Sequence, residues 1–123
     1  MSPAEIILVL LAAGTGLLLG SVVHELSHYA VLRISGHDPT LLWPQLDASR
    51  LQFRVEYEHP TSVTPITVRL AAVAPVAGGL VLAAGLLISG VTSSAAGLAF
   101  TVGSVIWALK LSPQDRAVVR GDL

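Results

Sequence analysis

The chain has 123 residues, of which 53% are hydrophobic and only 12% are charged, and its formal net charge is −1. A soluble domain carries about 25% charged residues, so this chain has too few charges to cover a water-soluble globule. Disordered chains are rich in charge and nucleic-acid-binding proteins carry a basic field, so both classes are excluded. The absence of cysteine excludes disulfides, thiolate metal sites and thiol nucleophiles. The composition therefore predicts one small integral membrane domain over residues 1–123.

The first apolar segment covers residues 6–32 and begins with an uncharged run over residues 6–23. A helix over the whole segment is about 40 Å long, which is enough to cross a bilayer with some tilt. A cleavable signal peptide is the alternative interpretation, but a basic n-region is absent and the apolar stretch is too long. We therefore predict a first transmembrane helix over residues 6–32.

Two further apolar segments, residues 70–88 and 91–109, have only Ser89 and Gly90 between them. Such a short connection predicts a tight hairpin of two transmembrane helices. Pro75 lies inside the second segment, where a membrane helix tolerates it if a neighbour satisfies the freed backbone carbonyl. The fold class predicted is thus an α-helical membrane protein with three transmembrane helices.

All the basic residues fall either between the first and second segments or after the third. They are Arg33, Arg50, Arg54, Arg69, Lys110, Arg116 and Arg120. With three spans, these two regions lie on the same side of the membrane. The positive-inside rule then predicts a multi-pass protein of the cell membrane, with its N-terminus outside and its C-terminus in the cytoplasm.

The only sizeable polar segment covers residues 36–67, between the first two predicted helices. Apolar and polar side chains alternate over residues 51–58, and this period of two is typical of a half-buried strand. Residues 40–46 are the candidate partner strand, with a turn over residues 47–50. Because two strands alone are marginally stable in water, we expect this β-hairpin to lie against the helices or the membrane face.

The first apolar segment contains the sequence H-E-x-x-H over residues 24–28. On a helix His24 and His28 lie on one face, so both imidazoles can bind one Zn²⁺ ion. Glu25 is placed to act as general base toward a water that zinc activates by lowering its pKa to about 7. Gly16 and Gly20 share the stripe of the two histidines and favour close approach of another helix, which would place the metal between helices. A structural cluster of polar side chains is the alternative interpretation.

A catalytic zinc ion usually has three protein ligands, so a third ligand is expected elsewhere. The candidates in the sequence are His37, Asp38, Asp47, His59 and Asp115. His37 and Asp38 follow the first span too closely to fold back easily onto it. Pro113 breaks the third helix and could turn Asp115 toward the site, whereas the alternative for Asp115 is a solvated carboxylate beside Arg116.

Three motifs resemble, in the same order, those of the site-2 protease family of intramembrane zinc metalloproteases. Residues 24–28 resemble the zinc motif, and residues 69–79, R-L-A-A-V-A-P-V-A-G-G, resemble the A-G-P segment with Ala74 in place of glycine. Residues 111–115, L-S-P-Q-D, resemble the N-x-x-P-x-x-D-G region, without its Asn, with a shorter spacing and with Arg116 in place of glycine. The resemblance covers nearly the whole chain and implies a three-helix catalytic core. It further implies that Asp115 is the third zinc ligand and that a strand near the site holds extended substrate.

The sequence thus predicts an intramembrane zinc metalloprotease that cleaves membrane-protein substrates within or near the bilayer. His24, His28 and Asp115 are the predicted metal ligands, Zn²⁺ is the cofactor and Glu25 is the catalytic base. One alternative is a non-proteolytic metal-binding scaffold or regulatory subunit with the same fold, and another is a transporter or channel fragment. The glycine-rich helix faces are compatible with self-association, and no nucleic-acid partner is expected.

Overall fold

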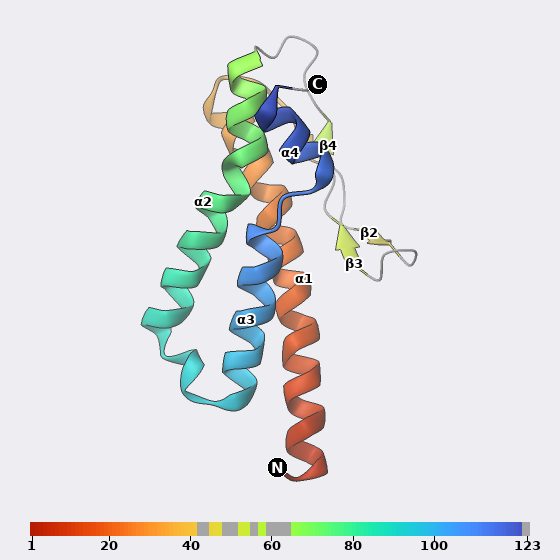
Figure 1. The fold of residues 1–123 in the computed structure, drawn as a ribbon, viewed down its shortest axis with the longest axis vertical. Helices are drawn as coiled ribbons and strands as arrows, with labels where there is room; N and C mark the ends of the chain where they lie inside the picture. Colours follow the sequence, from red (N-terminus) through yellow and green to blue (C-terminus); the bar gives the residue numbers. More distant parts are fainter. Residues whose placement is uncertain (42–44, 48–51, 55–56, 59–64, 122–123) are drawn as a thin grey trace.

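The computed structural model describes residues 1–41, 45–47, 52–54, 57–58 and 65–121. The elements in chain order are α1 (Pro3–Ile34), β1 (Thr40–Leu41), β2 (Gln45–Asp47), β3 (Gln52–Arg54), β4 (Tyr57–Glu58), α2 (Pro65–Ser89), the 3₁₀ turn η1 (Val91–Ser93), α3 (Ala95–Leu109) and α4 (Pro113–Arg120). Helices α1, α2 and α3 pack against one another, and α4 lies at the end of this bundle where α1 ends and α2 begins (Figure 1).

Two helices, α1 and the Ile66–Ser89 part of α2, are each long and apolar enough to cross a membrane. Helix α1 starts at a capping box, in which the Ser2 hydroxyl accepts from the Glu5 N–H and the Glu5 carboxylate accepts from the Ser2 N–H. The chain therefore has the helices of a membrane protein, and both extend beyond the predicted segments 6–32 and 70–88.

The third predicted span covers residues 91–109, but the helix that forms there, α3, begins only at Ala95. Gly90 takes a left-handed conformation with φ 77°, and the Ser94 side chain then caps α3 by accepting from the Gly97 N–H at 3.0 Å. Helix α3 has 15 residues, or about 22 Å, which is shorter than the roughly 30 Å of a hydrocarbon core. It reaches membrane length only together with α4, from which it is bent by 44°.

Glycines on α1 allow the backbones of α1 and α3 to come into direct contact. A Cβ atom added at Gly16 would lie 2.2 Å from the Phe100 carbonyl oxygen, and one at Gly20 would lie 2.3 Å from the Ser104 oxygen. The α3 backbone approaches α1 a second time at Gly103, where an added Cβ atom would lie 2.8 Å from the Ala13 oxygen. The prediction that the two glycines admit a neighbouring helix is confirmed, and α3 is that helix.

Large apolar side chains are exposed on the outer faces of the bundle, including Leu10, Leu11, Leu80, Val81 and Ile106. Lipid tails are as apolar as these side chains, so this distribution suits a bilayer and not an aqueous surface. Several polar side chains are instead buried inside the bundle, among them His24 and His28.

The segment between α1 and α2 contains short antiparallel strand pairs in its described residues. Strand β2 pairs with β3 in the register Gln45↔Arg54 to Asp47↔Gln52, and β1 pairs with β4. These strands are two or three residues long, so the described pairing is much shorter than the alternation over residues 51–58 predicts. Strand β3 lies against α1 (Figure 1).

Candidate metal site

Two buried histidines on one face of α1 form the first half of the site. The Nε2 atoms of His24 and His28 are 3.2 Å apart, and their rings meet edge to face with centroids 4.9 Å apart. Positions i and i+4 are neighbours on a helix surface, so this arrangement follows directly from the spacing. It lies in the last third of α1, near the end of the bundle that carries α4 (Figure 1).

Asp115 reaches the histidines because α3 stops and α4 starts in a new direction. Helix α3 ends at Leu109, and Pro113 becomes the first residue of α4 because its ring cannot continue the preceding helix. A capping box fixes the new helix: the Ser112 hydroxyl accepts from the Asp115 N–H at 3.0 Å, and Asp115 Oδ2 accepts from the Ser112 N–H at 3.2 Å. Asp115 thereby lies in the first turn of α4 and faces α1.

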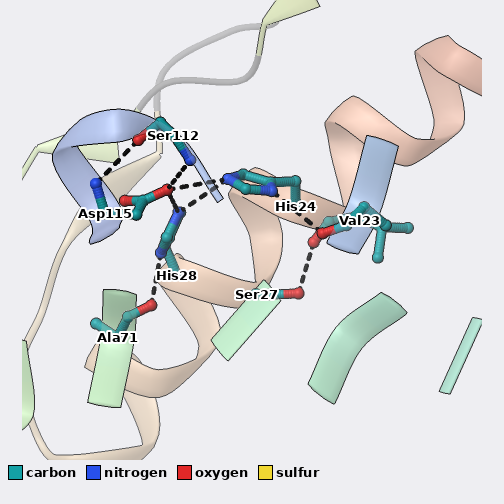
Figure 2. A network of polar contacts seen from close by, with 8 residues as sticks. Val23, His24, Ser27, His28, Ala71, Ser112 and Asp115 are labelled. Atoms are coloured by element: carbon teal, nitrogen blue, oxygen red, sulfur yellow. Dashed lines mark hydrogen bonds and ion pairs between the residues drawn. The ribbon is translucent and has the colours of Figure 1, made fainter. Parts of the chain in front are cut away.

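The three candidate ligand atoms converge on one point. Asp115 Oδ2 lies 3.4 Å from His24 Nε2 and 3.5 Å from His28 Nε2 (Figure 2). Tetrahedral zinc ligands at roughly 2.0–2.1 Å from the ion are separated from one another by about 3.3 to 3.4 Å. The observed separations match that value, so His24, His28 and Asp115 are close enough to bind one metal ion.

Backbone carbonyls fix the orientation of both rings. Nδ1 of His24 lies 3.2 Å from the Ala108 oxygen. Nδ1 of His28 lies 2.5 Å from the Ala71 oxygen (Figure 2). A carbonyl only accepts, so each Nδ1 carries the proton, and in the neutral rings each Nε2 presents a lone pair. Metal-binding histidines commonly donate their other ring N–H in this way, which also makes them more basic ligands.

Of the other candidate ligands, the two whose side chains the structure describes, His37 and Asp38, are not part of this group. Among the described residues, His24, His28 and Asp115 form the only cluster of three or more potential metal ligands. Asp38 accepts from the Arg33 guanidinium instead. His59 and the side chain of Asp47 lie outside the described residues. Glu25, the predicted catalytic base, is half-buried and follows His24 directly on α1.

The sequence analysis did not identify the residues that support the ligands, namely Ala71, Ala108 and Ser112. Two of them act through backbone carbonyls, which no side-chain motif reveals. A signal existed for Ala71, because Pro75 four residues later marks the carbonyl that loses its helical donor. Ser112 also carried a signal, since serine before proline, with an acidic residue three positions on, is typical of a helix start.

Comparison with protein-family models, with curated proteins and with solved structures gives no match to this chain. The fold and the geometry of the three ligands are therefore the basis for assigning a function.

Proposed function

We propose that the protein is an intramembrane zinc metalloprotease that hydrolyses peptide bonds of membrane-protein substrates. The observation that carries this proposal is the convergence of two buried imidazoles and one carboxylate within 3.2 to 3.5 Å of one another. Three protein ligands with a fourth position left for water are typical of catalytic zinc sites. His24 and His28 lie on a membrane-length helix, and buried ionisable groups at such positions are usually functional.

The proposal assigns a role to each residue of the site. His24, His28 and Asp115 would hold the zinc ion, which when bound would supply Lewis-acid activation of water and of the scissile carbonyl. Glu25 accepts a proton from the attacking water and returns it to the leaving amine. The carbonyls of Ala71 and Ala108 keep the two imidazoles aimed at the metal position, so that the chain itself does not need to rearrange for binding.

The substrate is a membrane protein whose helix unwinds locally. In an intact transmembrane helix every carbonyl is hydrogen-bonded within the segment, so the peptide bond must leave the helix before it is cleaved. Strand β3 lies beside α1 and could pair with such an extended segment, which is recognition by β-augmentation. As the third span we propose α3, with its bent continuation α4 lying at the cytoplasmic end of that span.

The proposed topology places the site on the cytoplasmic side of the membrane. Arg33 lies in the last turn of α1, Arg69 lies in the first turns of α2, and Lys110 follows α3. Helix α4, the continuation of α3, lies beside the end of α1 and the start of α2 at one end of the bundle (Figure 1). The positive-inside rule assigns this end to the cytoplasm. His28 lies six residues before the end of α1, or about 9 Å along the helix, so water needs only a short path to it.

Replacing Glu25 with glutamine tests the proposal. The purified protein is mixed in detergent with single-span reporter proteins whose helices contain destabilising glycine and proline residues, and cleavage is followed by mass spectrometry. We expect the wild type to cleave at least one reporter within its span. Glu25→Gln should lower the rate by about 100-fold or more, because it removes the general base, while the bound zinc is retained.

Glu5→Gln is the matched control, since it makes the same change on α1 at an exposed carboxylate of the N-terminal cap. It should leave both cleavage and zinc content unchanged. Zinc binding by a wild type that cleaves none of the reporters would instead favour the non-proteolytic scaffold. A Glu25→Gln variant that cleaves at the wild-type rate would contradict the assigned role of Glu25.

A further inference from the structure

Pro75 lies inside α2, four residues after Ala71, and its ring is fully buried. In a regular α-helix the carbonyl of residue 71 accepts a hydrogen bond from the N–H of residue 75. Proline has no N–H, and its ring also presses against the carbonyl four residues earlier. The Ala71 oxygen instead lies 2.5 Å from Nδ1 of His28, on the neighbouring helix (Figure 2).

We propose that Pro75 is a positioning residue for the metal site, because it keeps the Ala71 carbonyl available to orient His28. With Nδ1 donating to Ala71, the Nε2 lone pair of His28 points at His24 and Asp115. This inference rests on the metal site of the proposed function and adds a residue from α2, which contributes no ligand of its own to the cluster.

The two histidines obtain their carbonyl partners in different ways. His24 donates to Ala108 in the last turn of α3, where helix carbonyls have no donor within the helix. His28 lies against the interior of α2, where a carbonyl is ordinarily used by the N–H four residues later. Only proline at position 75 removes that competing donor, which gives a physical reason for a helix-breaking residue at this point of the bundle.

Two variants separate the backbone effect from packing. Pro75→Ala and Pro75→Val both restore the N–H at position 75, but they fill the buried space differently. In each, the new N–H competes for the Ala71 carbonyl, so the His28 ring loses part of its support. We expect zinc affinity, measured by competition with a chelator, to fall by about 10- to 100-fold and to a similar extent in both variants.

A second readout does not require the metal. Nitrogen-15 NMR of the metal-free wild type, at a pH where imidazole is neutral, should show the His28 proton on Nδ1. Both Pro75 variants should shift this signal toward a mixture of the two tautomers. Pro3→Ala is the control, because Pro3 occupies the first position of α1, where a backbone N–H has no acceptor within the helix.

Unchanged zinc affinity in both Pro75 variants, or a loss in only one of them, would overturn the inference, since a loss in one variant alone is a packing effect. A His28 proton found on Nε2 in the metal-free wild type would overturn it without any variant. If the wild type binds no zinc, the proposed function fails, and the tautomer of His28 still decides whether Pro75 orients the ring.

Discussion

Replacing His24 with alanine should abolish zinc binding under conditions in which the wild type binds one ion per chain. Loss of an outer hydrogen-bond partner already weakens metal sites by about 10- to 100-fold, and His24 is itself one of the three ligands of the cluster. We therefore expect zinc affinity to fall by more than about 100-fold. Elemental analysis of the purified protein, followed by chelator competition, measures the change.

His37→Ala is the matched control for this experiment. His37 follows the end of α1 and lies outside the ligand cluster of the described residues, so its variant should bind zinc as the wild type does. Equal zinc content in His24→Ala and wild type would show that the ion binds elsewhere and would contradict the assignment of the site.

Replacing Gly20 with valine should destabilise the bundle and remove the metal site together. A Cβ atom at position 20 would lie 2.3 Å from the Ser104 oxygen and 2.8 Å from the Trp107 Cβ atom, so α3 must move away. Overpacking costs typically about 1–3 kcal/mol, and a clash with backbone is not relieved by a rotamer change. His24 lies one turn further along the same face of α1, and Asp115 follows α3. A movement of α3 away from α1 therefore also moves Asp115 away from the two histidines. Thermal unfolding in detergent and zinc content measure the two effects.

Gly14→Val provides the comparison on the same helix. An added Cβ atom at Gly14 meets nothing within 4 Å, so this variant should keep the melting temperature and the zinc content of the wild type. If Gly20→Val were as stable as Gly14→Val and bound zinc equally well, close contact of α1 with α3 would not be what assembles the site.

The parts of the site that depend on local geometry could be predicted from the sequence. The spacing of His24 and His28 defines their relative position, because four residues complete about one helical turn. The stripe that continues through Gly16 and Gly20 predicts the buried, closely packed face for the same reason. For Asp115 the sequence offered Pro113 as a helix break and the family resemblance, but the residues alone left Asp47 and His59 open as third ligands. The choice depends on how α4 packs against α1, which is a tertiary property.

The elements that differ from prediction depend on features that hydropathy does not record. The apolar run over residues 91–109 continues across the start of α3, where the positive φ of Gly90 and the Ser94 cap delay the helix. Alternation over residues 51–58 predicts a strand but does not specify how many of its residues pair with a neighbouring strand. The described pairs are two or three residues long. The carbonyls that bind the two histidines belong to other helices, so no local pattern around the histidines reveals them. The one signal in the sequence was Pro75, which leaves the Ala71 carbonyl without its helical donor.

Zinc X-ray absorption spectroscopy of the purified wild type is the most direct test of the metal site. The account predicts one zinc ion per chain, coordinated by two imidazole nitrogens and by oxygen donors, with the imidazole signal reduced in His24→Ala. A protein that takes up no transition metal when reconstituted in detergent, or a zinc environment without two imidazoles, would contradict it.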